Sequence, residues 1–355
     1  MKNNPNKRLR LFDITRDGKG VSKKDSDLGT GLKRFFVTYK NHFNKILTVN
    51  IIMVLGNFPL LFLIAALSGY TQKESFAPMQ DLFQNFAGFF SSEAPSANSM
   101  ALYAITGLHA PSLVPSTLTY VFYGISALTL FTFGFVNVGT AYVLRNIAKG
   151  EPVFVWSDFW YAVKRNWRQA LIMGIIDVLI NVILIGNIYL MVARGTSNYL
   201  ESVLLWSNII IFILYFFMRY YIYVQMVTFN LKIWKILKNS LIFALLGFKR
   251  NFVALLGILV CLVFEVAFIF AFRGILISFG VALPLLILFS TFAYMKVFAA
   301  YYKIKEVMID PYVTDAGDND GDNDADAEDD EPIMKDDVTE AERLAEIKRR
   351  NGIIN

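Results

Sequence analysis

Long apolar runs alternate with shorter polar segments along most of the chain. Runs of about 20 or more residues, the length that crosses a hydrocarbon core of roughly 30 Å, recur along it. They begin near Ile46, Thr117, Ala170, Val203, Phe252 and Gly274. This pattern predicts an all-α membrane protein with six transmembrane helices, at residues 46–69, 117–144, 170–193, 203–227, 252–272 and 274–298.

A short basic-aromatic motif precedes the first, third and fifth runs, at residues 39–43, 163–167 and 248–252. Each copy has an apolar residue or tyrosine, then lysine, two polar residues and an aromatic one. We interpret the copies as one repeated unit, an amphipathic interfacial helix followed by a hairpin of two spans. The alternative is convergence, because cations and aromatics commonly mark the point where a span begins.

The positions of lysine and arginine predict the orientation, since cytoplasmic segments collect them. The basic arm at residues 1–31 and the segments after the second and fourth spans are rich in both residues, whereas residues 70–116 contain only Lys73. Both termini are therefore expected in the cytoplasm of a multi-pass protein of the cell membrane. The first run is too long for a signal-peptide core, so we expect it to stay as an anchor.

Two segments fall outside the spans of the membrane domain at residues 32–309. Within the exterior insertion at residues 70–116, residues 76–90 include seven large apolar residues, which favours a short helix on the outer surface over the alternative of a binding lid. The tail at residues 310–355 is acidic and of low complexity, so we expect it to be disordered, with a short helix near its end. A calcium loop is excluded there, because centring it on Gly321 puts Ala316 and Ala327 at ligand positions.

Composition agrees with a membrane protein, since 55% of the residues are hydrophobic and 32 are phenylalanine. The net charge of +5 averages a basic arm and an acidic tail. We expect the arm to attract anionic lipid of the bilayer and not nucleic acid. The single cysteine, Cys261, excludes an intramolecular disulfide.

The residues that usually carry catalysis are sparse. The two histidines, His42 and His109, are predicted on opposite sides of the membrane, and the sequence has no metal-binding spacing, nucleophile elbow or phosphate loop. We therefore expect no enzyme activity, no cofactor and no metal.

Charged residues inside the spans are the candidate functional residues, since such charges are costly and face protein, water or a partner. Asp177 and Arg219 lie about eight residues from the same side of the membrane, so at about 1.5 Å per residue they can pair. The pair is either a gate or proton-coupled switch, or a structural link within a hairpin. Glu265 is the candidate pathway or switch residue, because the sixth span has no cation at the same depth. Its carboxyl group is expected to be protonated, to face water, or to be hydrogen-bonded to Asn137, Asn181 or Asn187.

Residues 135–174 combine a small-residue turn of a span, a basic stop with a Gly-Glu pair, an aromatic helix and the basic-aromatic motif. Residues 47–60 add a first span with an asparagine and a proline. Together these phrases resemble the YesL-like family of bacterial membrane proteins, whose function is unassigned. The resemblance implies an association with uptake of plant-polysaccharide sugars and brings no catalytic residues. The long insertion, the basic arm and the acidic tail depart from the family's compact form.

Two functions fit these observations. The first is an accessory or assembly factor for a membrane complex such as a carbohydrate importer, with another membrane protein as its partner. The second is a small transporter or channel built from parallel hairpin repeats.

Overall fold

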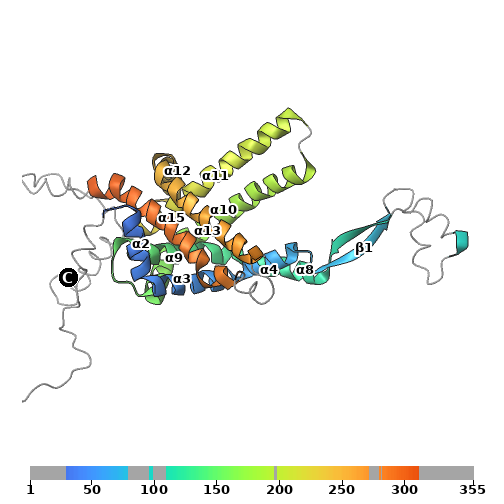
Figure 1. Ribbon diagram of the computed structural model, residues 1–355, viewed down its shortest axis with the longest axis horizontal. Helices are drawn as coiled ribbons and strands as arrows, with labels where there is room; N and C mark the ends of the chain where they lie inside the picture. Colours follow the sequence, from blue (N-terminus) through green and yellow to red (C-terminus); the bar gives the residue numbers. More distant parts are fainter. Residues whose placement is uncertain are drawn as a thin grey trace, which may run out of the picture.

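The computed structural model describes residues 29–78, 96–98, 109–195, 198–271, 280 and 282–311. The helices are α2 (Leu32–Asn41), α3 (Phe43–Gly56), α4 (Phe58–Leu67), α8 (Thr117–Ser126), α9 (Thr129–Lys149), α10 (Val155–Arg194), α11 (Tyr199–Thr228), α12 (Ile233–Leu246), α13 (Phe248–Ala271) and α15 (Phe289–Ile304). Two π-helical turns, η2 (Pro284–Leu288) and η3 (Lys305–Ile309), flank α15, and two strands, β1 (Gln72–Pro78) and β2 (His109–Pro115), form a ribbon (Figure 1).

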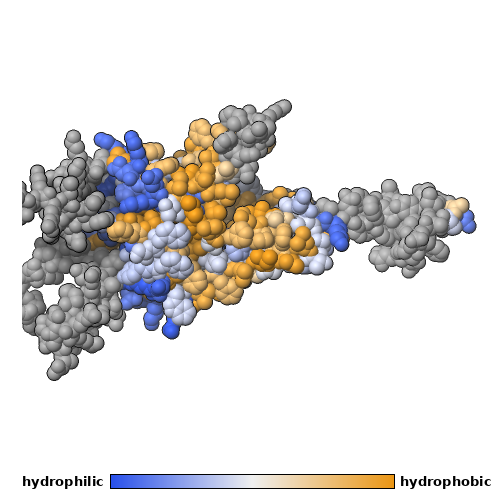
Figure 2. Space-filling model, turned by 90° about the horizontal axis from the view of Figure 1, so that it is seen from below, coloured by the Kyte–Doolittle hydropathy of each residue, from blue (hydrophilic) through white to orange (hydrophobic). Residues whose placement is uncertain are grey.

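Five helical segments of the described chain are long and apolar enough to cross a membrane: Thr117–Lys149, α10, α11, Phe248–Phe270 and Pro284–Ile309. A sixth span is possible if α3 and α4, bent by 58° at Asn57, count as one. Hydrophilic residues gather at the two ends of a broad apolar belt (Figure 2). An all-α fold with five or six helices able to span a membrane is thus confirmed and is compatible with a multi-pass protein, whereas the three-hairpin layout and the side on which the termini lie stay predictions.

Most of the predicted spans differ by a few residues from the helices in the structure, and the last and the third differ most. The last helix runs on through η3 to Ile309, beyond the predicted end at 298, because Ala300, Tyr302 and Ile304 continue its buried face. The predicted start of that span, at 274–279, lies outside the described residues. The third predicted span follows the aromatic helix before it without a loop, across a kink at Asn166 within the 40 residues of α10.

The basic-aromatic motif coincides with a break in helical geometry. The first two copies bend at equivalent positions, His42 (φ −113°, ψ 18°) and Asn166 (φ −115°, ψ 15°). In the third copy the break comes earlier, at Gly247 (φ −89°, ψ 13°), directly before the motif. The basic-aromatic motif therefore marks the bend between two successive helices in two copies, with the bend shifted in the third.

Part of the exterior insertion forms an antiparallel ribbon, paired from Gln72 with Pro115 to Pro78 with His109. At its base Ser116 caps α8, and the hydroxyls of Ser116 and Thr119 donate to the carbonyl of Thr71. This ribbon is not predicted by the sequence pattern. Of the residues expected to form a surface helix, Phe76 lies in β1 instead, and the others, from Met79 to Phe90, lie outside the described residues.

Asn50 joins the first and last membrane helices at the π-helical turn that begins with Pro284. Its amide donates to the carbonyls of Pro284 (3.1 Å) and Leu285 (2.7 Å), and its oxygen accepts from the backbone N–H of Ser290 (2.8 Å). A proline in a helix leaves backbone groups without their usual partners, which must be satisfied inside a membrane. The fully buried Asn50 thus bonds three backbone groups of this irregular turn.

Candidate functional site at Asp177

Asp177 of α10 is fully buried and lies at the centre of a hydrogen-bonded cluster. Its Oδ1 accepts from Tyr215 Oη (2.8 Å) and Asn181 Nδ2 (2.8 Å), and its Oδ2 from Tyr223 Oη (2.7 Å). Arg219 Nε lies 2.9 Å from Oδ1 and 3.0 Å from Oδ2. The structure therefore brings the two predicted charges together and surrounds the carboxylate with donors.

The spacing of residues on α11 explains why the cluster forms. Tyr215, Arg219 and Tyr223 follow one another at intervals of four, so their side chains share one face of the helix. Asn181 stands one turn after Asp177 on α10 in the same way. We did not predict the two tyrosines, although their spacing from Arg219 was the signal that could have identified them.

Burying a carboxylate costs free energy unless it is paired and hydrogen-bonded. Here one guanidinium supplies the opposite charge, and three neutral donors occupy the remaining lone pairs of Asp177. Such a saturated site leaves little capacity for a ligand at the carboxylate itself. Its geometry suits a link that holds α10 against α11.

A cavity of about 50 Å³ lies beside this cluster, between α9, α11 and α15. Arg219 borders it together with Lys296 of α15, whose Nζ lies 5.8 Å from the ring centre of Phe216 and makes no ion pair within the described chain. Tyr220, 1% exposed, also lines it, and its hydroxyl has no hydrogen-bond partner among the described residues. Lys296 is not among the candidate residues predicted from the sequence.

Glu265 stands apart from the Asp177 cluster, on α13. It is buried, and its Oε1 has no hydrogen-bond partner within the part of the chain that the structure describes. Two of its three expected partners are engaged elsewhere, since Asn181 donates to Asp177 and Asn137 donates to the carbonyl of Phe133. The structure thus does not bring Glu265 together with the other candidate residues.

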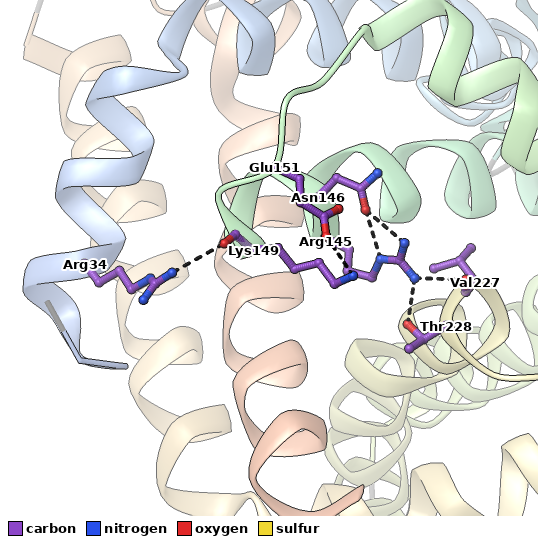
Figure 3. A network of polar contacts seen from close by, with 7 residues as sticks. All are labelled: Arg34, Arg145, Asn146, Lys149, Glu151, Val227 and Thr228. Atoms are coloured by element: carbon purple, nitrogen blue, oxygen red, sulfur yellow. Dashed lines mark hydrogen bonds and ion pairs between the residues drawn. The ribbon is translucent and has the colours of Figure 1, made fainter. Parts of the chain in front are cut away.

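Arg145 follows the predicted second span directly, where the sequence predicts a polar cytoplasmic segment, yet it is buried inside the bundle. Its guanidinium donates to Asn146 Oδ1 (2.9 and 3.1 Å), to the carbonyl of Val227 (3.0 Å) and to Thr228 Oγ1 (3.2 Å) (Figure 3). It also lies 4.7 Å from the ring centre of Tyr142. A cation at these last carbonyls of α11 stabilises the end of that helix.

The same network reaches the N-terminal helix α2. Arg34 Nη2 donates to the carbonyl of Lys149 (3.4 Å), and Lys149 Nζ pairs with Glu151 Oε1 (3.1 Å) (Figure 3). The end of α9 therefore links α2 and α11. Among the described residues no three histidine, cysteine, aspartate or glutamate side chains are grouped so that they could hold a metal ion.

Comparison with known proteins gives one match. A family described as "Protein of unknown function, DUF624" matches residues 113–188, which contain α8, α9 and most of α10, including Asp177. The match also includes residues 135–174, which carry the resemblance to the YesL-like family. No curated protein and no solved structure matches the chain. Over this segment the chain is similar to a family whose function is unknown.

Proposed function

We propose that this membrane protein is an accessory or assembly factor for another complex in the cell membrane, with a partner membrane helix on the hairpin of α10 and α11. The observation that carries the proposal is the position of this hairpin, whose outer halves extend away from the other helices (Figure 1). The carbohydrate importer is proposed as the complex on the basis of the family resemblance. The proposal includes no catalytic step, cofactor or nucleic-acid partner.

Most of the apolar surface of the hairpin is exposed: α11 is the least buried of the membrane-length helices described, and α10 is buried to 17%, as α13 is. Only 11% of the most apolar stretch of α11 is buried, compared with 44% for Pro284–Ile309. Ile183 and Ile210 are 59% and 64% exposed. Lipid alone can cover such a surface, so a second feature is needed to favour a protein partner.

Asn187 supplies that feature. Its side chain is exposed on the outer half of α10 and forms no hydrogen bond with any described residue. An amide that faces hydrocarbon is costly, whereas a hydrogen bond across two membrane helices is favourable by about 1 kcal/mol. An apolar hairpin with one exposed amide is the surface we expect for packing against a partner helix.

A photoreactive amino acid placed at Ile183 or Ile210 in cells is expected to crosslink one protein in a discrete band. Val263 of α13, which is 68% exposed, is the matched control and should give only lipid adducts. Asn187→Leu is expected to reduce the crosslink from Ile183. Adducts to lipid alone at all three positions would contradict the proposal.

A second candidate, a small transporter or channel, is favoured by the cavity between Arg219 and Lys296. Two cations beside one carboxylate leave a positive charge that suits a small anion. If this candidate holds, proteoliposomes should conduct chloride, phosphate or carboxylated sugars, and Lys296→Met should abolish the flux. Lys303→Met, which removes a cation paired with Glu306 on the same helix, should not. No flux of any of these anions would eliminate this candidate.

A further inference from the structure

A groove of about 410 Å³ lies between α2, α13 and α15, away from the Asp177 cluster. Its walls are mainly apolar, formed by Leu32, Phe35, Phe36, Val253, Met295 and Phe298. The volume is within the range of roughly 300–1,000 Å³ that is usual for small-molecule sites. Apolar walls of this size suit a hydrocarbon chain.

One end of the groove is polar and positively charged. Thr30, Lys249 and Arg250 line it. Arg250 Nη2 lies 3.2 Å from Thr30 Oγ1 and 3.4 Å from Glu306 Oε2, which orients its guanidinium at the mouth of the groove. Lys249 is exposed and forms no ion pair or hydrogen bond with any described residue, so its ammonium group is free to bind an anion.

The depth of this charged end matches that of a phospholipid headgroup. Lys249 and Arg250 come at the N-terminal end of α13, directly before its apolar stretch. Their neighbour Glu306 lies in η3, just after the C-terminal end of α15. Hydrophilic residues are gathered at the ends of the apolar belt (Figure 2). Basic pockets between membrane helices at this level bind the headgroups of anionic lipids.

We propose that this groove binds one anionic glycerophospholipid, with its phosphate at Lys249 and Arg250 and an acyl chain along Phe36, Val253 and Gly257. Free phosphate does not explain the apolar walls, and an uncharged lipid does not explain the two cations. Gly257 keeps the floor open, since a Cβ there would already lie 3.2 Å from Met295 Sδ. The site is independent of the proposed assembly function.

The chain contains a matched control for the charged end. Lys164 and Arg165 occupy the equivalent positions in the second copy of the basic-aromatic motif. There Arg165 donates to Tyr161 Oη (2.9 Å) on its own helix and lies 5.7 Å from the ring centre of Tyr161. Replacing this pair removes the same charge from the same motif without touching the groove.

The test is native mass spectrometry of the full chain in mild detergent, titrated with phosphatidylglycerol or phosphatidylcholine. The wild type is expected to retain one phosphatidylglycerol in preference to phosphatidylcholine. The double variant Lys249→Gln/Arg250→Gln should weaken this binding by about tenfold or more, since each cation contributes about 1 kcal/mol. The double variant Lys164→Gln/Arg165→Gln should bind as the wild type does.

A second variant tests the apolar part of the site. Gly257→Leu fills the floor of the groove and should reduce retention of both lipids, with the charged end intact. Melting temperatures of all variants are compared with that of the wild type, so that a loss of fold is recognised. Equal retention of the two lipids by the wild type, or equal losses in the two double variants, would overturn the proposal.

Discussion

Replacing Asp177 with leucine is expected to lower the free energy of unfolding by about 3 kcal/mol, because the change leaves the guanidinium of Arg219, whose side chain is only 19% exposed, without its counter-ion. Two tyrosine hydroxyls and the amide of Asn181 also lose their acceptor. Arg219→Met should have a similar effect, since it leaves the carboxylate of Asp177 without a charge partner. Unfolding in mixed detergent micelles, followed by tryptophan fluorescence, measures both.

The double variant Asp177→Leu/Arg219→Met distinguishes the coupling energy between the two charges from the contribution of each residue alone. Removing both charges together removes the unpaired charge, so the double variant should be more stable than either single variant. A double variant whose destabilisation equals the sum of the two single losses would show that the charges do not act as a pair. Stability unchanged in both single variants would contradict the structural role of the cluster.

Replacing Gly174 with leucine should prevent stable packing of α9 against α10, the largest effect that we expect from a single substitution. The two helices meet at Gly134 and Gly174, and a Cβ on Gly174 would lie 2.6 Å from the Cα and backbone nitrogen of Gly134. A Cβ on Gly134 would in turn overlap the carbonyl oxygen of Ala170. Close backbone contact through small residues is a common way in which membrane helices pack.

The smaller substitution Gly174→Ala should give a smaller loss of stability, which can be measured. Overpacking costs about 1–3 kcal/mol where neighbours can move, and backbone atoms move less readily than side chains. We therefore expect a loss of about 3 kcal/mol, with reduced accumulation in the membrane. Gly186→Ala is the matched control on α10, because a Cβ there has no neighbour within 4 Å. Equal stabilities of the Gly174 and Gly186 alanine variants would contradict the close contact.

The contact between Asp177 and Arg219 was predictable because each residue of an α-helix adds a fixed rise, so the number of residues from the end of a span gives the depth in the membrane. Both spans are regular helices at these residues, so the same distance from one side of the membrane places the charges at the same level. The tyrosines on the same face follow from the same periodicity. This part of the site can therefore be predicted from the sequence, because α10 and α11 are regular helices at these residues.

Other features depend on contacts between distant segments and could not be read in this way. The ribbon has proline at the ends of both strands and no clear alternation, and its base is held by contacts between Thr71 and the start of α8. Arg145 resembles any cation at the end of a span, yet its partners lie on α11, 82 and 83 residues later. Lys296 gains its significance only when the last helix is placed beside Arg219.

The central claim is that a partner membrane protein packs on the hairpin of α10 and α11. Purification of the full chain from its native membrane in mild detergent, followed by mass spectrometry of the isolated particle, tests this claim most directly. We predict one membrane protein at a fixed stoichiometry, lost on Asn187→Leu and retained in the lipid-site variant Lys249→Gln/Arg250→Gln. A homogeneous particle that contains only this chain and lipid would contradict the claim.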